Sequence, residues 1–302
     1  MRLCRFNDNR LGIVDGPTVR DVTAALDVLP KQSYPLPTHD LLVEHLDRVV
    51  ERARTLVKDA QALAADSVTL LSPVANPGKI IAAPVNYEKH RIEATTDPQL
   101  HGNNPGSAFS IHTAGLFLKS TSSLVGPGEG VVIRLPSRRT DHEVELVVVI
   151  GKRANHVTRQ DAMAYVAGYS IGLDISIRGS EDRSFRKSPD SYTVLGPWLV
   201  TADEVANPGA LDLQITVNGE VRQQSNTRHF ILGVAELIEL ASSMYTLYPG
   251  DLIFTGTPEG VSPIHAGDSI MATIANIGSM AVAVRAGEAV SAPAMSASSA
   301  GA

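Results

Sequence analysis

The sequence has 302 residues, and its 26 lysines and arginines against 32 aspartates and glutamates give a formal net charge of −6. This acidic balance excludes the basic surface of a nucleic-acid-binding protein. With 43% hydrophobic and 19% charged residues, the chain is typical of a protein that buries a sizeable core. The single cysteine, Cys4, excludes an intrachain disulfide and a thiolate zinc site. No apolar run approaches the roughly 18 to 20 residues that span a bilayer, so we expect a cytoplasmic protein that binds neither membranes nor nucleic acid.

Residues 1–75 predict a small N-terminal α/β domain. Short alternating runs at Arg2–Phe6 and 11–14, joined by Asn, Asp and Gly, are typical of a β-hairpin. From residue 40 to 64, apolar residues recur every three or four positions and predict a helix, with Thr38 as its N-cap. A segment with several Pro and Gly residues then ends the pattern and indicates a domain boundary.

Residues 76–286 predict a larger, strand-rich domain, and an Ala- and Ser-rich tail, 287–302, is expected to be flexible. Helices are expected at 158–165 and 231–244. Because strands and helices do not alternate in regular βαβ order, the pattern disfavours a doubly wound sheet and favours an α+β, mostly β fold. The expected strands are 79–83, 116–119, 130–133, 143–151, 167–177, 196–200, 211–217, 251–255 and 269–274.

An acidic pair opens the most apolar strand of the sequence. Glu143 and Glu145 lie two residues apart, so in a strand their side chains share one face, and from Leu146 onward both faces are apolar. Two carboxylates at the mouth of a buried strand repel each other unless a cation lies between them. An all-oxygen site suits a hard divalent ion, Mg²⁺, Mn²⁺ or Ca²⁺. A solvated strand end is the alternative interpretation.

A third acid, Asp174, is embedded in another apolar strand. It is a candidate ligand for the same metal. A buried ion pair with Arg178, four residues later, is an equally good interpretation of the spacing.

His90 and Glu93 form a candidate catalytic pair. On a helical turn, three-residue spacing lets the carboxylate reach the imidazole. A carboxylate orients a histidine and raises its basicity, as a general base acting on water requires. Many surface helices carry the same spacing, so an exposed pair without function remains the alternative.

A basic segment follows Asp174 and contains Arg178, Arg183, Arg186 and Lys187. Two acids within it favour a solvated loop of mixed charge. Next to a metal site, the same segment is suited to receive an anionic substrate.

Taken together, the motifs resemble the fumarylacetoacetate hydrolase family over residues 79 to 285. No single motif is specific, but the ordered set is. The motifs occupy residues 80–93, 117–119, 143–146, 168–178, 187–190, 196–198, 217–227, 249–251 and 255–258.

The resemblance implies a catalytic domain of the family's mixed β-roll type, often dimeric, behind a small N-terminal domain. It implies that Glu143, Glu145 and Asp174 ligate Mg²⁺ or Mn²⁺, with Ca²⁺ as a third candidate, and that His90 and Glu93 activate water. The residues placed at substrate-contacting or charge-stabilising positions are Lys187, Arg178, Gln223, Thr257 and Tyr87.

The function expected from this family is hydrolysis of a C–C bond in a β-diketo acid, an acylpyruvate or a fumarylpyruvate-like compound, by a homodimer. Decarboxylation, isomerisation or hydration of a 2-oxo diacid through the same metal is the alternative, and a non-catalytic binding protein is a third. The sequence departs from the family in the short spacing between Asp174 and Lys187, which shortens the loop that carries substrate contacts in the family. The polar stretch 94–115 predicts either a lid over the metal or a surface loop.

Overall fold

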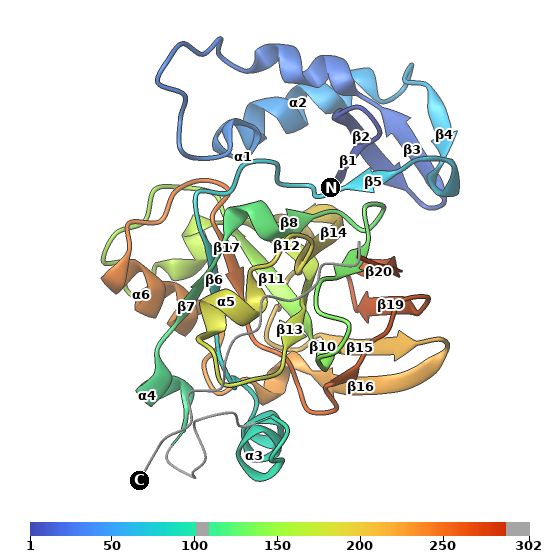
Figure 1. Ribbon diagram of the computed structural model, residues 1–302. Helices are drawn as coiled ribbons and strands as arrows, with labels where there is room; N and C mark the ends of the chain where they lie inside the picture. Colours follow the sequence, from blue (N-terminus) through green and yellow to red (C-terminus); the bar gives the residue numbers. More distant parts are fainter. Residues whose placement is uncertain (101–108, 288–302) are drawn as a thin grey trace, which may run out of the picture.

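The computed structural model describes residues 1–100 and 109–287. The fold is mostly β, with a few short helices, and confirms the predicted α+β class (Figure 1). Of the predicted tail, 287–302, all but residue 287 lies outside the described residues. Of the 94–115 stretch, residues 101–108 lie outside them. In the described residues, no helix is long and apolar enough to cross a bilayer.

The N-terminal segment forms a small sheet covered by two helices, as the upper part of Figure 1 shows. The predicted helix over 40–64 is confirmed as far as Leu56 and wrong beyond it. It is interrupted at His45 and ends at Leu56, because Ala62–Ala64 extends instead to pair with residues 18–20. The elements are β1 (Arg2–Phe6), β2 (Arg10–Asp15), β3 (Thr18–Asp21), β4 (Ala62–Ala64), β5 (Leu70–Leu71), α1 (Leu41–Glu44) and α2 (Leu46–Leu56).

Asp40, and not Thr38, caps the first of these helices. Its Oδ1 accepts a hydrogen bond from the backbone N–H of Val43 at 3.1 Å. Its Oδ2 accepts from the N–H groups of Ala75 at 2.9 Å and Asn76 at 3.0 Å. One buried carboxylate thus joins the start of the helices to the segment that enters the second unit.

A single sheet runs through both units. Its path is β4-β3-β2-β1-β14-β12-β11-β17-β6-β7, and β1 pairs with β14 through Arg2↔Val200 and Leu3↔Leu199. Every residue of β11 is buried, as expected for a strand with neighbours on both sides and apolar layers above and below. The strands of the second unit are β6 (Ile80–Ala82), β7 (Phe117–Lys119), β8 (Leu124–Val125), β11 (Val144–Ile150), β12 (Val166–Asp174), β14 (Thr193–Thr201) and β17 (Leu252–Phe254).

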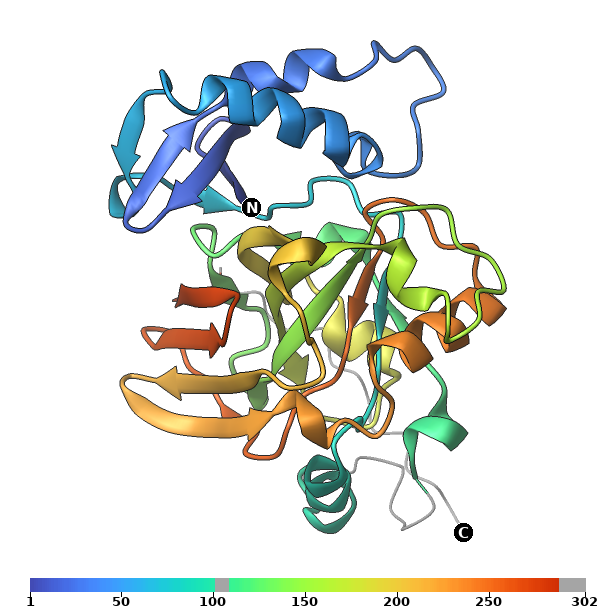
Figure 2. The ribbon, with the colours of Figure 1, turned by 180° about the vertical axis from the view of Figure 1, so that it is seen from behind.

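Two smaller sheets complete the second unit. The order β13-β10-β18 forms one, and β16-β15-β19-β20-β9 forms the other, whose long β15–β16 hairpin projects from the body in Figure 2. Four strands of these sheets, β10, β16, β18 and β20, were not predicted. Strand β16 is polar and mostly exposed, so it carries little hydrophobic pattern. Their bounds are β9 (Val131–Ile133), β10 (Thr140–His142), β13 (Ser176–Ile177), β15 (Asp212–Val217), β16 (Glu220–Asn226), β18 (Ser262–Pro263), β19 (Ser269–Ile274) and β20 (Gly278–Ala286).

Four helices lie around this body (Figures 1 and 2). The helix expected at 231–244 is confirmed. The helix expected at 158–165 is only a 3₁₀ turn, Ala162–Tyr165. The side chain of Thr158 bonds to that of Asp161 at 2.8 Å within a turn and does not cap a helix. The helices are α3 (Glu88–Thr96), α4 (Ile111–Ala114), α5 (Arg183–Lys187) and α6 (Val234–Met244).

Candidate metal and catalytic site

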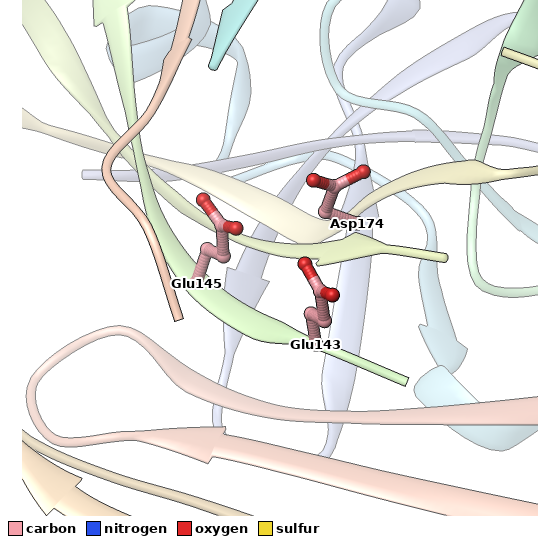
Figure 3. Close-up of side chains that lie close together, drawn as sticks. All are labelled: Glu143, Glu145 and Asp174. Atoms are coloured by element: carbon pink, nitrogen blue, oxygen red, sulfur yellow. The ribbon is translucent and has the colours of Figure 1, made fainter. Parts of the chain in front are cut away.

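Three buried carboxylates meet where β11 and β12 run side by side. Glu143 and Glu145 come from the start of β11, and Asp174 from the end of β12, which pairs with it through Val144↔Leu173. Each acid offers an oxygen, and these oxygens all lie within 4.8 Å of one another. Figure 3 shows the three side chains converging from the two neighbouring strands. The shared face predicted from the alternation is therefore present.

Two lysines bind Asp174. Lys119 Nζ lies 2.5 Å from its Oδ1 and also donates to the carbonyl of Tyr192, at 2.8 Å. Lys187 Nζ lies between the acids, in a short contact with Asp174 Oδ2 and 2.7 Å from Glu143 Oε2. Lys187 thus reaches the site despite the short connection before it.

Arg178 binds other acids and not Asp174, so the ion pair considered as an alternative for Asp174 is absent. Its Nη2 donates to Glu143 Oε1 at 2.7 Å, and its Nε donates to Asp141 Oδ2 at 2.8 Å. Burial by itself raises the pKa of Glu143, but Lys187 and Arg178 outweigh it and hold this pKa below its usual range. Glu143 is therefore ionised.

Glu145 differs from its neighbours because it forms no ion pair with the residues that the structure describes. Its Oε2 accepts one hydrogen bond, from the backbone N–H of Gly256 at 2.7 Å. Burial and then the charge of Asp174 raise its pKa well above the usual value. A cation at this position would remove that penalty, and a cluster of three carboxylate oxygens is the donor set that Mg²⁺ or Mn²⁺ prefers. The residues present therefore fit the predicted metal.

His90 and Glu93 lie on α3 as predicted. His90 Nδ1 lies 2.9 Å from Glu93 Oε2, and the other carboxylate oxygen accepts the backbone N–H of Gly260 at 3.0 Å. Because a carboxylate accepts, the Nδ1 carries the hydrogen, and Nε2 is left with a lone pair that can take a proton. His90 is buried and lines the same pocket as Glu143 and Glu145. The exposed-helix alternative does not apply to this pair.

The loop from residue 255 to 260 binds one acid of the metal site and the acid of the catalytic pair. The sequence did not predict this role. Gly256 bonds Glu145, and Gly260 bonds Glu93. Both glycines have positive φ, +94° and +93°, and a Cβ on Gly260 would lie 2.2 Å from the carbonyl oxygen of Arg222. Two adjacent signals in the sequence, Gly-Thr-Pro and a second Gly, mark this loop.

Gln223 and Thr257, both predicted to contact substrate, have different surroundings. Thr257 lines the pocket, and its hydroxyl donates to the carbonyl of Val144 at 2.9 Å. Gln223 is buried behind it: Nε2 donates to Thr257 Oγ1 at 2.9 Å and to the carbonyl of Pro258 at 2.7 Å, and Oε1 accepts from Val144 N at 3.1 Å. All of these bonds are internal, so Gln223 supports the site from behind.

His142 completes this buried network. Its Nδ1 lies 3.2 Å from Gln223 Oε1 and its Nε2 2.8 Å from Ser262 Oγ. Burial lowers its pKa to about 4, against a smaller opposite effect of the bond to Gln223. His142 is therefore neutral, with its hydrogen on Nδ1.

Tyr87, like Gln223, is a predicted contact that does not line the pocket. Its ring packs edge-on against Phe230, with centroids 5.0 Å apart. Its hydroxyl is buried and has no hydrogen-bond partner among the described residues. A role for Tyr87 in substrate binding remains a prediction.

The pocket itself combines apolar, acidic and basic walls. Ala94, Leu100 and Phe109 contribute to it, so both described ends of the 94–115 stretch reach the site. Residues 101–108 lie outside the described part, and a lid function remains a prediction. The ionisable residues that line the pocket are His90, Glu143, Glu145, Arg178, Glu181, Arg183, Arg186 and Lys187.

The chain belongs to the fumarylacetoacetate hydrolase family. Residues 79–285 match the family model described as the fumarylacetoacetate (FAA) hydrolase C-terminal domain, as the sequence motifs predict. The comparisons also confirm the predicted class of enzyme, a metal-dependent hydrolase of this family.

Two relatives are particularly informative. A maleylpyruvate hydrolase of Aquipseudomonas alcaligenes is 58% identical over 287 residues, which cover 94% of this chain and 99% of that protein. A crystal structure of maleylpyruvate hydrolase from Sphingobium sp. SYK-6, in complex with manganese(II) and pyruvate, has a TM-score of 0.80 and 38% identity, and covers 95% of this chain and 100% of that one. A mitochondrial oxaloacetate tautomerase of Bos taurus is more distant, 36% identical over 87% of this chain and 83% of that protein.

Proposed function

We propose that the protein hydrolyses the C–C bond of an acylpyruvate of the maleylpyruvate or fumarylpyruvate type, a reaction of aromatic catabolism. The observation that carries the proposal is that His90, held by Glu93, lines the same pocket as Glu143 and Glu145, two of the three acids of the metal site. Hydrolysis needs both a place for a 2-oxo acid and a base that activates water. The 58% identity to a maleylpyruvate hydrolase supports the choice of substrate.

The residues divide the chemistry between them. Glu143, Glu145 and Asp174 would hold Mg²⁺ or Mn²⁺, which supplies a Lewis acid for negative charge on the 2-oxo acid. His90 removes a proton from water, and the oxygen attacks the acyl carbonyl carbon. The bond from that carbon to C3 of the pyruvate unit breaks, and its electron pair stays on C3, which takes a proton. One acylpyruvate and one water thus give one carboxylic acid and one pyruvate.

The test is product identification with a panel of acylpyruvates and oxaloacetate in the presence of Mg²⁺ or Mn²⁺. We expect pyruvate and the matching acid from the acylpyruvates, and loss of turnover in EDTA. His90→Gln should lower kcat by about 100-fold or more while Mn²⁺ binding is unchanged, whereas His265→Gln, at an exposed position, should change neither. Turnover of acylpyruvate by His90→Gln at the wild-type rate would contradict the role of His90.

Decarboxylation, isomerisation and hydration of a 2-oxo diacid form the second candidate. The likeness to an oxaloacetate tautomerase favours it over other chemistries. Such a reaction releases no pyruvate from an acylpyruvate, so the same panel separates the two functions.

We further propose that the enzyme works as a cytoplasmic homodimer, as its family resemblance implies. Light scattering coupled to size-exclusion chromatography gives the mass in solution. A mass near 32.1 kDa, that of one chain, would contradict the dimer.

A further inference from the structure

Two arginines of the pocket form no ion pair within the described part of the chain. Among the residues that the structure describes, no carboxylate lies within ion-pair distance of Arg183 or Arg186, although both line the pocket together with Glu143 and Glu145. Arg186 donates only to backbone carbonyls, through Nε to Glu181 at 2.8 Å and through Nη1 to Ile177 at 3.0 Å. The guanidinium carbon of Arg183 lies 5.0 Å from the centre of the Phe109 ring.

The other cations around the site are matched. Arg178 and Lys187 bind the acids of the metal site, and Arg138 binds Glu181 through two contacts, of 2.6 and 2.8 Å. Glu181 is therefore already paired, and its charge acts on Arg186 only from beyond ion-pair distance. Burial lowers the pKa of both Arg183 and Arg186, which means that their environment disfavours the charge that they carry. A bound anion is the group that would offset this cost.

The segment that carries these arginines is held in place. Arg138 Nη2 donates to the carbonyl of Arg178 at 2.7 Å. Asp182 accepts the N–H of Ser184 at 2.8 Å at the start of α5. The two guanidinium groups are thus presented from a constrained backbone, which reduces the entropy lost on binding.

We propose that Arg183 and Arg186 form a subsite for a second carboxylate of the substrate, at the end of the molecule opposite its 2-oxo acid. This inference rests on the proposed function for the position of the 2-oxo acid at the metal. It makes the enzyme selective for diacids: an acylpyruvate that ends in a carboxylate fits, and one that ends in a methyl group leaves both arginines without a partner. Arg178 and Lys187, occupied by the acids of the metal site, do not supply this contact.

A pair of ligands that are not acylpyruvates tests the subsite without turnover. 2-Oxoheptanedioate and 2-oxoheptanoate have the same carbon chain and differ only in the terminal carboxylate. Calorimetry on the Mn²⁺-loaded enzyme should show about 10- to 100-fold tighter binding of the diacid. Arg183→Met and Arg186→Met should each remove much of this preference and leave the affinity for 2-oxoheptanoate within about twofold. Arg159→Met, at a side chain that is 61% exposed, is the matched control and should keep the preference.

Equal affinity of the wild type for the two ligands would overturn the subsite, and so would equal weakening of both ligands by the arginine variants. Arg186→Lys, which keeps a charge, should retain part of the preference; full loss with Lys would show that the two-pronged hydrogen bonding of the guanidinium is needed.

Turnover distinguishes this inference from the proposed function. If the wild type prefers the diacid but releases no pyruvate from any acylpyruvate, the proposed reaction is wrong and the carboxylate subsite stands. If it cleaves maleylpyruvate and acetylpyruvate equally well, and the variants do too, the reaction stands and the subsite is wrong.

Discussion

Replacement of Gln223 by leucine separates a supporting role from a substrate contact. Its side chain makes hydrogen bonds to four buried groups: the N–H of Val144, His142 Nδ1, Thr257 Oγ1 and the carbonyl of Pro258. Leucine has a similar size but leaves the two N–H donors without an acceptor in the described structure. At about 1 to 3 kcal/mol for each unsatisfied buried group, the loss of the two acceptor contacts in Gln223→Leu should lower the free energy of unfolding by about 2 to 6 kcal/mol.

Urea unfolding of the wild type and of Gln223→Leu, both loaded with Mn²⁺, measures this difference. The next residue supplies the control: Gln224 is exposed, and Gln224→Leu should change the free energy of unfolding by less than about 0.5 kcal/mol. If the two variants are equally stable and Gln223→Leu instead raises only the KM for acylpyruvate, the reasoning is refuted, because the amide would then bind substrate.

Three further outcomes follow from the structure. Gly260→Ala should lower kcat about 10-fold or more and leave Mn²⁺ affinity unchanged, since a Cβ there moves the N–H that holds Glu93; unchanged kinetics would contradict the role of this bond. The hydrogen bond from Arg138 lowers the pKa of Glu181 to about 2 from 4.5, so the stability contributed by the pair is complete above pH 4.5 and is lost as the pH falls towards 2. Arg138→Met should therefore lower the free energy of unfolding by less than about 1 kcal/mol near neutral pH and should have no effect near pH 2. Denaturant titrations at the two pH values measure the difference. Burial raises the pKa of the Cys4 thiol to about 12, so iodoacetamide should modify it only after unfolding, as mass spectrometry would show; rapid labelling of the folded protein would contradict its burial.

The parts of the site that sequence predicts are those that depend on local geometry. The two-residue spacing of Glu143 and Glu145 places both carboxylates on one face of a strand, and the three-residue spacing of His90 and Glu93 places them on one helical turn. Lys119 lacks such a signal: it reaches Asp174, 55 residues away, only because β7 pairs with β6 at Ile80↔Lys119 and lies near the end of β12.

The same distinction applies to the fold. Strands with continuous apolar runs, such as β11 and β12, were predicted. The polar strand β10 was missed although it is buried, and β16 was missed because only Gln223 and Asn226 of its residues are buried. The pattern over 40–64 suits a helix throughout, but Ala62–Ala64 finds hydrogen-bond partners on β3, and pairing of this kind depends on residues far away in the chain. The sequence predicts a basic segment but not which of its arginines has an acidic partner. Two residues outside the segment decide this: Asp141 binds Arg178, and Arg138 binds Glu181.

The acids of the metal site and the free arginines belong to different kinds of structure. The acids are on β11 and β12, central strands that are paired on both sides, whereas Arg183 and Arg186 are on the short connection between β13 and β14. A change in the strands disturbs the core of the whole molecule, but exchange of this connection leaves the sheet intact. Descendants of one enzyme can therefore diverge in the charge of the substrate that they accept while inheriting the same reaction, provided that Arg178 and Lys187, which bind the acids of the metal site, are kept. An engineer can follow the same route by exchanging only the residues between these two.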